Sequence, residues 1–187
     1  MLRRCFNICL IVGCVFLLLP SAFGQEVVHA LSGTLVSVNS KAKTITVKTD
    51  DGSEGLFRDM TKSNASLDFD KDLWANMAAA DASMKTGTRI IVFYVGDSSV
   101  RTEVAIENLG STPLQKSCGT VYKMEKHEHL LKIKDASGNI ESFQIIPKTI
   151  AETALGVVEG FKYHPDKGDQ VQIIANGSST ALYIGAV

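Results

Sequence analysis

The chain has 187 residues, of which 19 are basic and 20 acidic, so its net charge at neutral pH is −1. No long basic stretch occurs, and because a nucleic-acid binder needs a concentrated positive surface, the composition argues against nucleic acid as a partner. Only one of the four cysteines, Cys118, follows residue 24, so an intramolecular disulfide is not expected and stability must come from packing.

The first 24 residues have the pattern of a secretory signal peptide. Two arginines precede an apolar run at residues 5–19, and small residues at positions 22 and 24 favour cleavage after Gly24. This run is shorter than the roughly 20 residues that span a membrane. A lipoprotein anchored at Cys14 is the alternative, because residues 11–14 resemble a lipobox. We therefore expect a secreted or periplasmic protein without a transmembrane segment, with 17 basic and 20 acidic residues after cleavage.

Residues 33–57 and 119–143 are related at a constant offset of 86. Five identities carry the match: Gly33, Thr34, Lys48, Gly52 and Phe57 recur as Gly119, Thr120, Lys134, Gly138 and Phe143. Apolar positions recur as well, Val47 for example as Ile133. A gapless repeat of this kind indicates a duplicated structural unit.

The pattern inside each copy predicts β-strands. Residues 44–48, TITVK, and 131–134, LKIK, alternate apolar and polar side chains as half-buried strands do. Polar residues at 39–43 and 125–128 predict hairpin loops before these strands. In the preceding strand of each copy two apolar residues stand three apart, which predicts a β-bulge. Glycines at 52 and 138 then predict turns into a third strand that ends near Phe57 or Phe143.

An insert and two further strands complete each copy. Strands are expected at 89–95 and 104–106 in the first copy, and at 170–174 and 182–184 in the second. The first insert predicts a helix, because Leu73, Met77, Ala80 and Met84 share one helical face. In the second insert, Thr149 and Glu152 form a capping-box pattern that predicts a shorter helix.

This order of elements predicts a mainly β protein with two tandem five-stranded small barrels of the OB-like or SH3-like kind. Each barrel carries a helical insert between its third and fourth strands. The predicted boundaries are a signal peptide at 1–24, barrels at 32–109 and 117–187, and a linker at 110–116. Each copy is small enough to bury only about 60% of its unfolded surface, so the two are expected to pack together.

The same residues resemble a known type of domain. The GT-apolar start of each copy, TITVK at 44–48, KTGTRIIV at 85–92 and VAI at 104–106 are similar to uncharacterised domains of secreted bacterial proteins. The resemblance covers Gly33 to Leu109 and Cys118 to Val187. It implies small β-barrels, often in tandem, and a family without an established activity.

His127 and His129 are the candidate metal ligands. Two histidines at i and i+2 on a strand face the same side, and imidazole suits zinc, copper or nickel. Glu125 or Glu128 would be a further ligand. However, the aligned positions in the first copy are lysines, and a structural site needs about four ligands. Decoration of a solvated hairpin is therefore the favoured interpretation, with no resident cofactor, and a weak metal site is the alternative.

Two further motifs do not fulfil the requirements of the functional sites that they resemble, a calcium loop and a catalytic thiol. Asp68, Asp70 and Asp72 resemble the start of a calcium loop, but the glycine and glutamate that this loop requires at positions six and twelve are replaced by Leu73 and Ala79. Cys118 has no base nearby in the sequence, so a buried, small apolar role is expected. An intermolecular disulfide in an oxidising compartment is the alternative.

The sequence therefore predicts a non-enzymatic binding or interaction module outside the cytoplasm. Its partner would be a protein, an envelope polymer or a small ligand, and the chain contains no catalytic motif from which to argue an enzyme. A periplasmic metal-binding protein that uses His127 and His129 is the alternative function.

Overall fold

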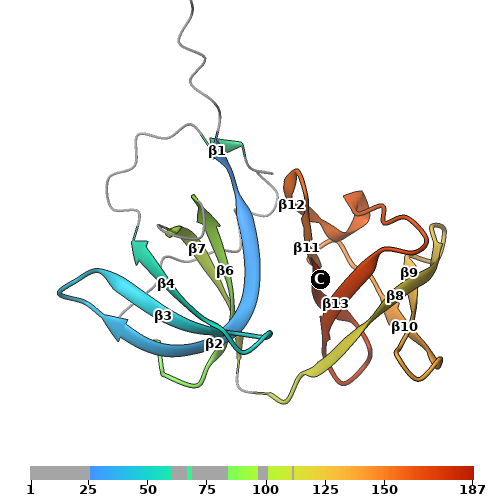
Figure 1. Cartoon of the computed structure of the whole chain (residues 1–187), viewed down its shortest axis with the longest axis horizontal. Helices are drawn as coiled ribbons and strands as arrows, with labels where there is room; N and C mark the ends of the chain where they lie inside the picture. The colour runs from blue at the N-terminus through green and yellow to red at the C-terminus, as the bar shows by residue number, and fades with distance from the viewer. Residues whose placement is uncertain (1–25, 60–66, 69–83, 97–100, 111) are drawn as a thin grey trace, which may run out of the picture.

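The protein is mainly β. The computed structural model describes residues 26–59, 67–68, 84–96, 101–110 and 112–187, and within these ranges every regular element is a strand except one 3₁₀ turn, Gly160–Lys162 (Figure 1). The proposed signal peptide and most of the first predicted helix lie outside the described residues. No helix in the described part of the chain is long and apolar enough to cross a membrane.

The first set of strands forms a closed barrel in the order β2-β3-β4-β7-β6. Its members are β2 (His29–Asn39), β3 (Thr44–Thr49), β4 (Glu54–Asp59), β6 (Arg89–Val95) and β7 (Arg101–Gly110). All pairs are antiparallel except β4 with β7, which is parallel. The alternation of each strand turns apolar side chains inward, and Phe57 and Val47 at the centre are completely buried. Two short strands, β1 (Glu26–Val27) and β5 (Leu67–Asp68), pair with each other in parallel outside this barrel.

The second set forms a seven-stranded sheet in the order β10-β9-β8-β13-β14-β11-β12. Its strands are β8 (Gln115–Glu125), β9 (Leu130–Lys134), β10 (Ile140–Gln144), β11 (Ile150–Thr153), β12 (Gly156–Glu159), β13 (Gln170–Ala175) and β14 (Ala181–Ala186). The prediction of a second five-stranded barrel is therefore wrong. In the barrel, β4 pairs in parallel with β7, whereas here β11 takes the corresponding place beside β14. An isolated parallel bridge between Gln144 and Thr180 joins the end of β10 to the residue that precedes β14.

The predicted helix that begins at Thr149 is also wrong. The insert is a β-hairpin, β11–β12, with Gly156 at φ +107° just after its two-residue turn. Thr149 is buried, and its hydroxyl donates to the carbonyl of Ala181 at 2.7 Å instead of capping a helix. Glu152 likewise finds its partners far away in sequence, on β2. Tertiary contacts thus replace the local bonds that the capping-box pattern predicted.

Strands β2, β3 and β4 share their hydrogen-bond register residue for residue with β8, β9 and β10. Strand β2 pairs with β3 as β8 pairs with β9 at the offset of 86, and the predicted bulge is confirmed in both, between Leu35 and Ser37 and between Val121 and Lys123. A Cβ at Gly33 or Gly119 would lie 2.6 or 2.5 Å from a carbonyl oxygen of the next strand. The matched glycines are therefore required by close backbone approach.

A shared apolar cluster joins the barrel to the second sheet. Phe93 and Ile91 of the barrel pack in one buried group with Ile150, Ile174 and Tyr183 of the sheet. Figure 1 shows β11 and β12 facing β2 at this junction, whereas β9 and β10 lie on the side of the sheet that is remote from the barrel. The outer face of β9, β10 and the second half of β8 is consequently free of the barrel, whereas Lys116, near the start of β8, donates a hydrogen bond to the carbonyl of Asp50.

Candidate functional site

The two histidines singled out from the sequence both lie in the β8–β9 turn, residues 126–129, so the expectation that they share one face of a strand is wrong. His127 is exposed, whereas the ring of His129 is stacked on Phe161 with 3.9 Å between ring centroids and 14° between planes. The backbone of His129 has φ +49°, and the aligned Lys43 has φ +52°. The carbonyl of His129 accepts a hydrogen bond from the amide of Ile145 at 2.8 Å. This position therefore shapes the hairpin in both copies, whichever side chain it carries.

Other ligands do not gather around the histidine pair in the described part of the chain. No group of three or more histidine, cysteine, aspartate or glutamate side chains is placed there to hold a metal ion. Glu125, a proposed further ligand, is engaged by two lysines instead. The metal site stays a prediction, and the geometry supplies it with two imidazoles at most from described residues.

The remaining sequence candidates are dispersed. Cys118 is exposed on β8, with its sulfur 4.0 Å from Oε1 of Gln172, so the expected burial of this thiol is wrong. The alternation of β8 places it outward, opposite Gln172 in the register. Of the carboxylates that resemble a calcium loop, Asp68 belongs to β5, and Asp70 and Asp72 lie outside the described residues.

The bulge in β8 creates the surface that we identify as the candidate site. A bulge places two residues of one strand opposite one residue of its partner, which breaks the alternation. Tyr122 and Lys123 are consequently both exposed, Tyr122 to 44%. Lys132 lies opposite Lys123 on β9 and points to the same face. We call the outer face of β8, β9 and β10 around these three residues the lysine–tyrosine face.

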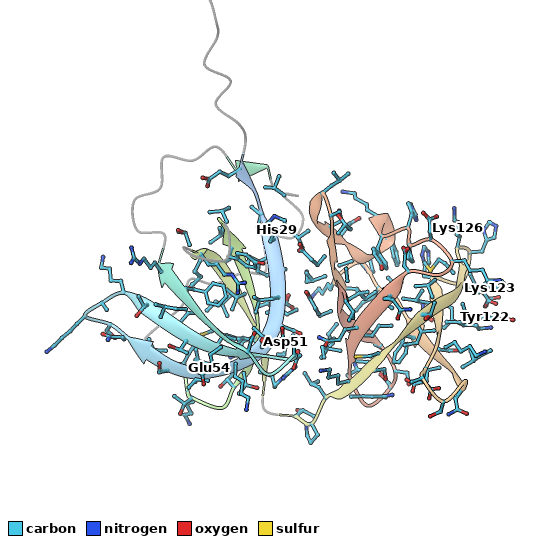
Figure 2. The ribbon with its side chains drawn as sticks, viewed as in Figure 1. His29, Asp51, Glu54, Tyr122, Lys123 and Lys126 are labelled. Carbon is cyan, nitrogen blue, oxygen red and sulfur yellow. The ribbon has the colours of Figure 1, made fainter. Side chains whose placement is uncertain are left out.

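The aromatic ring of this face has a cation beside it. Nζ of Lys167, from the loop before β13, lies 5.6 Å from the ring centroid of Tyr122, within the range of a cation–π contact. Figure 2 shows Tyr122, Lys123 and Lys126 at the outer margin of the sheet, directed away from the barrel. An extended ligand would therefore reach the ring and the lysines without contacting the barrel.

A carboxylate already occupies part of the face. Oε1 of Glu125 accepts hydrogen bonds from Nζ of Lys123 at 2.9 Å and from Nζ of Lys132 at 3.0 Å. These two bonds lower the pKa of Glu125 to about 2. The bond to Glu125 in turn raises the pKa of Lys123, so this carboxylate and this ammonium group are both charged at neutral pH.

The aligned face of the barrel has different chemistry. At the positions of Tyr122, Lys123 and Lys132 it carries Val36, Ser37 and Thr46. Its exposed apolar residues are Val36 at 40% and Leu56 at 57%. At these three positions the second unit (β8–β14) thus carries one aromatic and two cationic side chains, whereas the first unit (β1–β7) carries uncharged ones.

A second polar cluster lies at the junction, and the sequence analysis did not identify it. Nδ1 of His29 lies 2.6 Å from Oε1 of Glu152, and the amide of Ala30 donates to Oε2 of the same carboxylate at 2.7 Å. The hydroxyl of Tyr183 donates to the carbonyl of Ala30 at 3.0 Å. Burial raises the pKa of Glu152, and the hydrogen bonds from His29 and Ala30 offset part of the rise.

The role of this second cluster is to join the two units. A carboxylate beside an imidazole is also the unit that orients a general base in hydrolases. Here, however, both carboxylate oxygens of Glu152 are bound to β2, and the surrounding residues form the apolar cluster of the junction. No sequence signal pairs His29 with Glu152, because 123 positions separate them.

Comparison with known proteins adds no identification. No protein-family model matches the chain, and no curated protein matches it significantly in sequence.

Proposed function

We propose that the protein is an extracytoplasmic binding module without catalytic activity, and that it holds an anionic ligand on the lysine–tyrosine face. The observation that carries this proposal is the exposed ring of Tyr122, flanked by Lys123, Lys132 and Lys167. Charged groups on an open face attract an oppositely charged partner and steer its approach. An exposed ring adds contact area at a small cost in side-chain entropy.

We further propose that both units derive from an OB-type barrel, as in small domains of secreted bacterial proteins. The barrel order, with its third and fifth strands parallel, supports this assignment. OB folds bind ligands over the face of strands 2 and 3 and the adjoining loops. In the second unit those strands are β9 and β10, which belong to the lysine–tyrosine face.

The test is a binding assay with a panel of polymers of known charge. The panel contains polygalacturonate, poly-L-glutamate, a single-stranded oligodeoxynucleotide and neutral dextran, measured at low and high salt. We expect at least one anionic polymer to bind, with an affinity that falls as salt screens the charges, and dextran not to bind.

Matched variants locate the binding surface. Replacing Lys123 and Lys132 by glutamine should weaken binding at least tenfold. Replacing Lys41 and Lys48 by glutamine removes the same charge from the first unit, where both side chains are exposed, and should have little effect. Equal loss in both double variants, or no binding to any anionic polymer, would refute the proposal.

A further inference from the structure

The position of Glu125 on the lysine–tyrosine face suggests what the ligand resembles. Its carboxylate oxygen lies between two ammonium groups, 2.9 Å from Lys123 and 3.0 Å from Lys132. Ion pairs at an exposed surface contribute little stability, because solvent screens them and ordering the side chains costs entropy. An incoming carboxylate can therefore exchange with that of Glu125 without disturbing the fold.

We propose that Glu125 occupies the carboxylate subsite of the ligand, and that this ligand is an acidic polysaccharide with carboxylated sugars. The inference rests on the proposed function, and it adds the ligand class and an internal competitor. Lys123 and Lys132 bind one carboxylate of the sugar chain, while the ring of Tyr122 packs against the apolar face of a neighbouring sugar.

Three features favour a carboxylated sugar over other polyanions. The two lysines already bind a carboxylate with good geometry, which shows that this group fits between them. Arginine is the usual residue for bidentate phosphate recognition, and residues 112–187 contain none. Single-stranded nucleic acid stacks successive bases on several aromatic side chains, whereas Tyr122 is the one aromatic ring exposed on β8, β9 and β10.

If Glu125 competes with the ligand for the two lysines, its replacement should raise the affinity for the ligand and not lower it. Because Glu125 holds the two lysines, its removal should strengthen ligand binding although the residue belongs to the face. Asp166 is the matched control, since it is an exposed acid of the second unit, in the loop before β13. Replacing either residue by its amide removes one negative charge, so the general electrostatic gain is similar in both. The difference between them isolates the subsite.

The experiment titrates the full protein with polygalacturonate oligosaccharides. Affinity should rise about five- to tenfold in Glu125→Gln and no more than about twofold in Asp166→Asn, and Tyr122→Ala should lower it at least fivefold. An affinity in Glu125→Gln equal to that in Asp166→Asn, or lower than in the unmodified protein, would overturn the role of Glu125. Circular dichroism of each variant checks that the fold is kept.

The polymer panel separates failure of this inference from failure of the proposed function. Binding of poly-L-glutamate or of the oligodeoxynucleotide without binding of polygalacturonate would overturn the ligand class and leave the anion-binding face in place. If no anionic polymer binds, the proposed function and this inference both fail.

Discussion

Replacing Glu152 by alanine should destabilise the whole protein, because this carboxylate connects the two units. The change removes the acceptor of the Ala30 amide, in a residue that is only 3% exposed, and also the partner of His29. Leaving a buried donor without an acceptor costs about 1–3 kcal/mol, and the lost bond to His29 adds to this. We therefore expect a loss of about 3 kcal/mol. In a chain of this size that lowers the unfolding midpoint by about 6–12 °C.

Thermal unfolding followed by circular dichroism measures this effect. The apolar cluster at the junction contains residues of both units, so one cooperative transition is expected for the unmodified protein. Glu159→Ala is the control, because Glu159 belongs to the same hairpin and forms a 3.9 Å ion pair with Lys162 within its own unit. It should change stability by less than about 0.5 kcal/mol. A loss below about 1 kcal/mol in Glu152→Ala would show that the carboxylate does not hold the junction.

The same carboxylate gives the junction a defined pH dependence. Burial raises the pKa of Glu152 above its unfolded value of 4.5, so the folded protein binds this proton more tightly than the unfolded chain. The contribution of Glu152 to stability therefore falls as the pH rises from about 4.5 through the folded pKa. Glu152→Gln keeps the shape and removes the titration. The stability difference between unmodified protein and Glu152→Gln should consequently shift toward the variant as the pH rises, and a difference independent of pH would contradict this reasoning.

Three further predictions concern the second unit. Gly119→Ala should lower the free energy of unfolding by about 2 kcal/mol or more, because its Cβ would lie 2.5 Å from a backbone oxygen. In Gly177→Ala the new Cβ has nothing within 4 Å, so the free energy of unfolding should fall by less than about 1 kcal/mol. Urea unfolding compares the two variants. Cys118 is exposed, so it should react with a thiol reagent in the native protein nearly as fast as in denatured protein, and strong protection would contradict its exposure. Replacing His127 and His129 by lysine, as in the first copy, should leave the melting temperature within a few degrees. A zinc-dependent rise in melting temperature that this double variant abolishes would establish the metal site instead.

The sequence predicted the elements that depend on local pattern and failed where distant residues decide the structure. Strict alternation and the repeat gave the β2–β3 and β8–β9 hairpins, and the spacing of apolar residues gave their bulges. The capping-box pattern of Thr149 and Glu152 failed because both side chains bond to residues more than thirty positions away. The β-branched residues at 150 and 157–158 were the available signal for strands.

The candidate site was only partly predictable for the same reason. The two histidines mark the turn between β8 and β9, whereas the side chains of the candidate site lie on the two strands that this turn connects. Lys123 and Lys132 are nine residues apart, and only the bulged register places them on one face around Glu125. Recognising the bulge as the reason why Tyr122 points outward would have located the ring from the sequence.

The comparison of the two units indicates where the proposed ligand specificity would reside. The inward residues of both follow one pattern, because the shared register and the core leave little freedom. Among the described residues, the units differ on the outer face of β8–β10, and the β11–β12 hairpin, which docks on β2, stands beside β14 where the barrel has β4 beside β7. The hairpin fixes the second unit against the first through Glu152, and it does so on the side of the sheet remote from Tyr122 (Figure 2). Docking therefore leaves the lysine–tyrosine face open, as binding to a long polymer would require.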